Sequence, residues 1–199
     1  MEVAAEDGTA VRLPSGRARV VLAMLSAEAG REVSSDRLID LAWHGKPPAT
    51  SATQLHGLIS SLRRAFGPAR EAIVTQPDGY VLRADVDLAR MRELAKLGRD
   101  GLEDGKLDEA AARLSEALAL WRGRPFVGLD SGDLDTVADF IEQEYVGALE
   151  DYAEVELRRG NHAPLTRRLA GWVSAYPLRE NLRGTTCRCA RKPSVGLAA

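Results

Sequence analysis

The sequence predicts a mainly α-helical protein with a small β component: a winged helix-turn-helix followed by a tetratricopeptide-like helical domain. Three observations lead to this fold class. Two helical patterns flank a polar break within residues 34–66, a hairpin pattern follows at residues 73–83, and helical periodicity continues over residues 88–175. We therefore place the two domains at residues 1–85 and 86–184.

The composition is typical of a soluble globular protein. The chain has 199 residues, of which 45% are hydrophobic and 28% charged, and its formal net charge is −2. It contains no apolar run of the ~18 residues that a membrane span requires. Its first residues lack the basic and apolar regions of a signal peptide. We therefore expect a cytoplasmic protein without membrane contact.

Residue types that support catalysis or metal binding are scattered along the chain. The histidines show no metal-ligand spacing, and the pair Cys187 and Cys189 offers too few ligands for a metal and fits two reduced thiols. The sequence has no G-x-S-x-G motif, no Walker phosphate loop and no G-x-G-x-x-G motif. We expect no enzymatic activity, no metal and no cofactor.

The N-terminal segment predicts short strands and then a helix. Asp7-Gly8 is a hairpin-turn sequence flanked by Val3 and Val11. A helix follows, which we expect to end near Gly30. The apolar face of that helix is formed by Ala18, Val21, Leu22 and Leu25.

The helix-turn-helix pattern comes next. Ser34 and Ser35 can cap a helix over residues 35–43 with their side-chain oxygens, and the glycine and prolines of residues 44–48 stop it. A second helix is expected over residues 51–66, because its apolar residues recur at i, i+3, i+4, i+7 and i+11. These apolar residues are Leu55, Leu58, Ile59, Leu62 and Phe66.

A β-hairpin is expected directly after the second helix. Strands at residues 73–76 and 80–83 flank the tight-turn sequence Pro77-Asp78-Gly79. We expect Tyr80 to pack on the core. For Arg83, a DNA contact and an ordinary strand position remain open alternatives.

The second half predicts paired helices near residues 88–104, 106–121, 133–159 and 162–175. Small residues in the second of these helices would let two helices approach closely, as in tetratricopeptide repeats. Residues 185–199 show no apolar period, so we expect an irregular tail there.

The polar face of the helix over residues 51–66 suits contact with double-stranded DNA. Small side chains allow close approach to base edges, Gln54 and His56 can hydrogen-bond to bases or phosphates, and Arg63 and Arg64 can pair with phosphates. The alternative is a solvated face whose cations stabilise the helix C-terminus. The residues we expect at the DNA are Thr53, Gln54, His56, Gly57, Ser60, Ser61, Arg63, Arg64, Thr75, Gln76 and Arg83.

Several segments resemble a known family, the SARP-type (AfsR/DnrI/RedD) actinobacterial activators of antibiotic clusters. In the first half these are residues 38–43 (LIDLAW), 47–50 (PPAT), 62–67 (LRRAFG) and 79–82 (GYVL). In the second half they are residues 117–123 (ALALWRG) and 176–184 (YPLRENLRG).

The resemblance implies an OmpR-like winged helix, of the type that serves as output domain in phosphorelays, and a bacterial transcriptional activation domain. Such proteins bind direct repeats near promoters, with two copies on DNA expected, and recruit RNA polymerase. The family continues into another helical pair after residue 184, whereas this chain does not. We therefore expect a truncated activation domain with apolar surface exposed around Leu169, Trp172 and Leu178.

The alternative function is a protein–protein interaction module whose winged helix no longer binds DNA. Residues 1–85 contain ten basic and ten acidic side chains, and this neutral balance slightly favours the alternative. A neutral domain still binds DNA when its cations gather on one face. An electropositive, uncovered face on the helix over residues 51–66 would distinguish DNA binding from the alternative.

Overall fold

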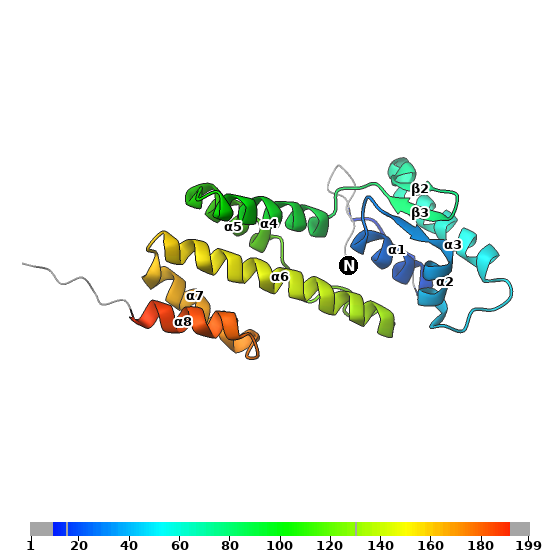
Figure 1. The fold of residues 1–199 in the computed structure, drawn as a ribbon. Coiled ribbons are helices and arrows are strands. Elements are labelled where there is room, and N and C mark those ends of the chain that lie inside the picture. The colour runs from blue at the N-terminus through cyan, green and yellow to red at the C-terminus, as the bar shows by residue number, and fades with distance from the viewer. Residues whose placement is uncertain (1–9, 15, 130, 192–199) are drawn as a thin grey trace, which may run out of the picture. The chain divides into compact units, whose positions relative to one another are not determined.

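Figure 1 shows the computed structural model, which describes residues 10–14, 16–129 and 131–191. The chain forms two compact units. One contains Met1–Arg90 and Arg122–Glu142, and the other contains Met91–Trp121 and Gln143–Ala199. The expected boundary at residue 85 did not include the second segment of the first unit. The hairpin expected around Asp7-Gly8 lies outside the described residues.

The first unit has the expected helix-turn-helix and hairpin. The helices over residues 35–43 and 51–66 are confirmed with the same bounds. Its elements are α1 (Arg17–Ala27), β1 (Glu32–Ser34), α2 (Ser35–Trp43), α3 (Ser51–Phe66), the 3-10 helix η1 (Gly67–Ala72), β2 (Ile73–Thr75) and β3 (Gly79–Leu82).

Local chemistry fixes the ends of α2. The Ser34 side chain accepts a hydrogen bond from the Arg37 amide at 3.2 Å, which satisfies one of the unpaired amides of the first turn. At the other end, His44 adopts the left-handed conformation with φ of 54°. Gly45 also has positive φ, and its amide bonds to the Asp40 carbonyl, so the chain turns away towards α3.

The sheet is antiparallel, with β3 between β1 and β2. Val33 pairs with Tyr80, and Val74 pairs with Val81. Strand β1 was not expected, because residues 29–32 read as a turn and three residues are too few to show alternation. A Cβ atom at Gly79 would overlap the Val33 carbonyl oxygen and lie 2.9 Å from the Ser34 Cα, so β1 and β3 require glycine there.

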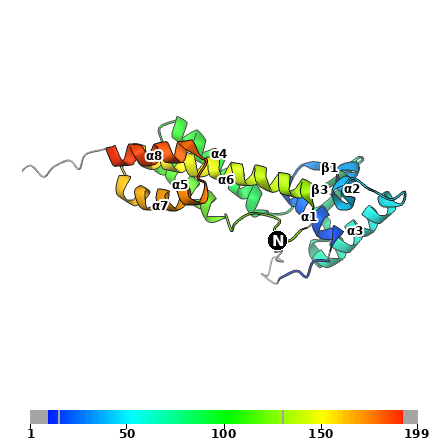
Figure 2. The same cartoon turned by 90° about the horizontal axis from the view of Figure 1, so that it is seen from below.

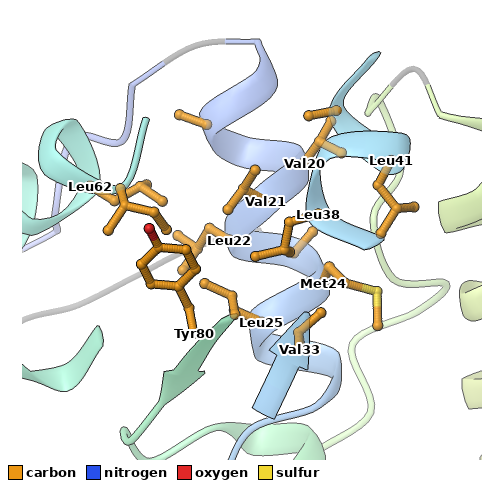
Figure 3. Packing of buried hydrophobic residues seen from close by; sticks show 14 of the residues in the cluster. Val20, Val21, Leu22, Met24, Leu25, Val33, Leu38, Leu41, Leu62 and Tyr80 are labelled. Carbon is orange, nitrogen blue, oxygen red and sulfur yellow. The ribbon is translucent and has the colours of Figure 1, made fainter. Parts of the chain in front are cut away.

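The core of the first unit surrounds α1. Figure 3 shows Val21, Leu22 and Leu25 of this helix facing Leu62 of α3 and Tyr80 of β3. The Tyr80 side chain is buried, which confirms its expected packing on the core.

Residues 122–142 complete the same core. Leu134 has 1% of its surface exposed and belongs to the cluster built on α1. The partly buried residues Phe126, Leu129 and Val137 pack against this cluster. The winged helix therefore includes a segment that follows it by about thirty residues, and that segment contains the start of α6 (Gly132–Arg158).

The second unit consists of paired helices, as expected. Besides most of α4 and α6, it contains α5, α7 and α8, and α7 and α8 lie side by side in Figures 1 and 2. A Cβ atom at Gly98 would lie 3.0 Å from Leu114 Cδ2, and one at Gly101 would lie 3.3 Å from the Ala110 Cβ. These two glycines therefore let α4 and α5 pack closely. The bounds are α4 (Asp87–Glu103), α5 (Leu107–Ala119), α7 (His162–Ala175) and α8 (Glu180–Arg191).

The structure corrects the expectation of an irregular tail from residue 185. Helix α8 continues to Arg191 and buries Leu182, Thr185 and Cys189. These three positions follow i, i+3 and i+7 spacing, a helical stripe that the polar neighbours conceal. Residues 192–199 lie outside the described part of the chain.

Helix α8 also changes the expected exposure of α7. Leu169 is fully buried and Trp172 is half-buried, because both pack into a cluster that includes Leu182 and Cys189 of α8. Only Leu178 has the exposure expected for this region, at 92%.

We predict that Gly79→Ala destabilises the first unit by about 3 kcal/mol, because the added methyl group displaces the β1 backbone. Denaturant unfolding would measure this change. The control is Gly57→Ala on α3, where a Cβ meets no atom within 4 Å and stability should stay equal or rise by up to about 1 kcal/mol. Equal effects for the two variants would contradict the close β1–β3 approach.

We predict that Leu134→Ala costs about 2–5 kcal/mol of winged-helix stability, because it opens a cavity in the core around α1. Amide exchange in α1, α2 and α3 should accelerate. Phe140→Ala on the same helix is the control, since Phe140 is 67% exposed and its truncation should change stability by less than about 0.5 kcal/mol. Unchanged exchange in the Leu134 variant would show that residues 122–142 are not part of this unit.

Candidate nucleic-acid interface

Helix α3 has one buried and one exposed face. Its buried residues are Leu55, Ile59, Leu62 and Phe66, which anchor it to the core of the first unit. The opposite face carries only polar, small or cationic residues. The exposed members of the predicted site on this helix are Thr53, Gln54, His56, Gly57, Ser60 and Arg64.

Two polar side chains of α3 are used within the helix itself. Gln54 Nε2 donates to Thr50 Oγ1 at 2.8 Å, which holds the glutamine towards the N-terminus of the helix. Ser61 is half-buried, and its hydroxyl donates to the Leu58 carbonyl at 2.7 Å. Ser61 is therefore less available to a ligand than the sequence indicated.

The two neighbouring arginines occupy different environments. Arg64 is exposed. Arg63 is half-buried, and its Nε and Nη2 donate to the Ile73 carbonyl at 3.1 and 2.7 Å. The same Nη2 donates to Thr75 Oγ1 at 2.8 Å. The sequence predicted that both arginines would bind phosphate, but the structure directs Arg63 to the hairpin.

The hairpin residues of the predicted site do not lie together. Thr75 and Gln76 lie at the turn end, where the Gln76 amide donates to the Gly79 carbonyl at 2.9 Å. Arg83 follows the last residue of β3 at the other end, and its amide donates to the Ala72 carbonyl at 2.7 Å. Its side chain is exposed, but it is separated from Thr75 and Gln76 by the length of the hairpin.

Most of the helix-turn-helix carries basic side chains without acidic ones. Residues 41–70 include four basic side chains, Lys46, Arg63, Arg64 and Arg70, and no acidic one. The neutral total for residues 1–85 conceals this segment, because the acidic residues lie before and after it. Counting charge by element rather than by domain would have shown it from the sequence.

The Arg63 guanidinium also acts on the buried phenol of Tyr80. Burial raises the pKa of Tyr80 above its usual value of 10.0, and the positive charge of Arg63 lowers it in part. The charge of Arg63 therefore acts on the Tyr80 phenol as well as on the acceptors of its hydrogen bonds.

These features define the class of protein. A capped helix, a turn, a second helix with a polar outer face and a β-hairpin form a winged helix-turn-helix, whose second helix enters the DNA major groove. Among the residues described, no cluster of three or more His, Cys, Asp or Glu side chains could hold a metal ion. No helix in the described part of the chain is long and apolar enough to cross a membrane.

Comparison with known proteins identifies the family. Residues 86–193 match the bacterial transcriptional activator domain. Regulatory protein DnrI of Streptomyces peucetius is 34% identical over 193 residues, covering 90% of this chain and 71% of DnrI. Regulatory protein AfsR of Streptomyces coelicolor is 30% identical over 181 residues, covering 89% of this chain and 18% of AfsR.

A solved structure agrees with the fold. Mycobacterium tuberculosis EmbR, in complex with a low-affinity phosphopeptide, has a TM-score of 0.84 and 29% identity, and the match covers 92% of this chain and 50% of EmbR. The chain belongs to the SARP family of transcriptional regulators. It is a transcriptional regulator, and the relatives it matches are named as regulatory proteins.

Proposed function

We propose that the protein activates a secondary-metabolite (antibiotic) biosynthesis cluster by binding direct repeats at its promoters. One observation supports DNA binding most strongly: the exposed face of α3 has cationic, polar and small side chains, and no acidic residue lies in residues 41–70. The resemblance to actinobacterial activators of antibiotic clusters supports the choice of target genes.

In this proposal, α3 lies in the major groove. Thr53, His56 and Ser60 contact base edges, and Gly57 allows close approach, because all four are exposed on one polar face. Gln54 contacts DNA only after its bond to Thr50 opens. Arg64 binds a backbone phosphate at the C-terminal end of the helix.

The hairpin supplies the wing. Thr75 and Gln76 lie at its turn end, where they contact the backbone or minor groove beside the α3 site. Arg83 is exposed at the opposite end of the hairpin, where it contacts a separate phosphate. The helical unit built on α4 to α8 makes the protein contacts of activation, with RNA polymerase as the partner and two copies of the chain on the direct repeats.

The test is a titration of the purified protein with the promoter DNA flanking its own gene, with shuffled DNA as the control, at two salt concentrations. Tighter binding to the promoter that weakens steeply with salt supports the proposal. Absence of binding to either DNA, from a protein shown to be folded, supports the interaction-module alternative instead.

We predict that Arg64→Ala weakens binding to promoter and shuffled DNA by similar factors and lowers the slope of log K against log salt by about 0.9, because one phosphate contact is lost. Arg113→Ala is the matched control, since it removes an exposed arginine from the helical unit. An unchanged slope in the Arg64 variant would contradict a phosphate contact at this position.

We predict that His56→Ala lowers affinity for the promoter by about 1–3 kcal/mol and leaves binding to shuffled DNA nearly unchanged, because a base contact carries sequence information. The measurement is the ratio of the two Kd values. Equal losses of affinity for both DNAs would indicate that His56 contacts the DNA backbone and not a base.

A further inference from the structure

A short link of six residues connects α3 to the wing. The connecting 3-10 helix η1 has no buried residue, and Ala69 within it departs from helical geometry. Gly67, the first residue of η1, has a positive φ of 58°. The connection therefore has no fully buried side chain, and Ala72 at its end packs against the core while only partly buried.

Strand β2 is one of the two edge strands of the sheet, because it pairs with β3 alone. Ile73, the first residue of β2, lies in the core with 1% of its surface exposed. Val74 is half-buried and Thr75 is exposed, so burial anchors the strand progressively less towards the turn. Thr75 and Gln76, which we assign to DNA, lie at this weakly anchored end.

Arg63 bridges α3 and this part of the strand. Its guanidinium holds the Ile73 carbonyl through two nitrogens, at 3.1 and 2.7 Å, and holds the Thr75 hydroxyl at 2.8 Å. It thus contacts both the anchored residue and the first exposed residue of β2. A planar guanidinium can make this set of bonds from one side chain, whereas a lysine ammonium is a point donor on a flexible stem.

The partners of Arg63 in the described structure are neutral oxygen atoms. The charged guanidinium therefore donates hydrogen bonds to Ile73 and Thr75 without forming an ion pair. The charge also reaches Tyr80 on β3, where it opposes the effect of burial on the phenol. The hydrogen bonds of Arg63 hold β2, and its charge also acts on a side chain of β3.

We propose that Arg63 is a positioning residue that fixes the wing relative to α3, so that wing and helix engage one DNA site together, and that phosphate binding at this end of α3 belongs to Arg64. This inference rests on the proposed DNA-binding function. It assigns different roles to two adjacent arginines that the sequence alone makes equivalent.

The first test compares Arg63→Lys with Arg63→Met. If Arg63 positions the wing, both variants lose about tenfold in promoter affinity, because neither side chain reproduces the bonds to Ile73 and Thr75. The salt slope of the lysine variant stays at the parental value. If Arg63 instead binds phosphate, the lysine variant keeps both affinity and slope, and the methionine variant loses about 0.9 of the slope. That second result overturns the proposal.

The second test uses a double-mutant cycle with Gln76→Ala. In the parent, Gln76→Ala should lower promoter affinity, because the wing is held at the DNA. In the Arg63→Met background the same change should lower it less, because the wing is no longer placed there. Additive losses would contradict coupling between Arg63 and the wing.

A third measurement needs no DNA. Amide exchange at Gln76, which bonds to Gly79 across the turn, should accelerate in Arg63→Met and Arg63→Lys but not in Arg64→Ala. Thermal unfolding of each variant separates this local change from loss of the fold. If the parent protein binds no DNA, the proposed function fails, and exchange at Gln76 still decides whether Arg63 holds the wing. Unchanged exchange at Gln76 in both Arg63 variants overturns the proposed positioning role of Arg63.

Discussion

The winged helix depends on the burial of α1. Eight of its eleven residues are buried, so the helix must be surrounded rather than packed on one side. Helices α2 and α3, the sheet and the segment around Leu134 all contribute to this cover. Because α3 uses its only apolar stripe to cover α1, its polar face is left outside. The packing of α3 on α1 therefore determines which way the proposed recognition surface faces.

Two tight approaches set the geometry around this arrangement. At Gly79 the backbone of β3 comes so close to β1 that no side chain fits. In the helical unit, Gly98 and Gly101 of α4 allow similar proximity to α5. In each case glycine is needed for the space it leaves and not for an unusual φ, since none of the three has a positive φ.

The two arginines at the end of α3 show how packing separates equal side chains. Adjacent residues of a helix point about 100° apart, so one of a pair can face a neighbouring element while the other faces solvent. The hairpin lies on the side of Arg63, where a carbonyl and a hydroxyl accept its hydrogen bonds. Arg64 is exposed and meets no such acceptor among the residues that the structure describes. Two arginines that are equivalent in the sequence are therefore unequal in their freedom to bind a new partner.

The sequence by itself determined the helix-turn-helix, the hairpin and the helical periods of the second half, because each has a strong local pattern: the cap at Ser34, the apolar stripe of α3 and the turn before Tyr80. It also determined the family, through motifs that no single local rule explains. Only the tertiary structure decided the pairing of β1 with β3, the burial of Leu134 against α1 and the extension of α8 to Arg191. It alone separated Arg63 from Arg64. These features depend on contacts between residues distant in sequence, for which a local pattern carries no signal.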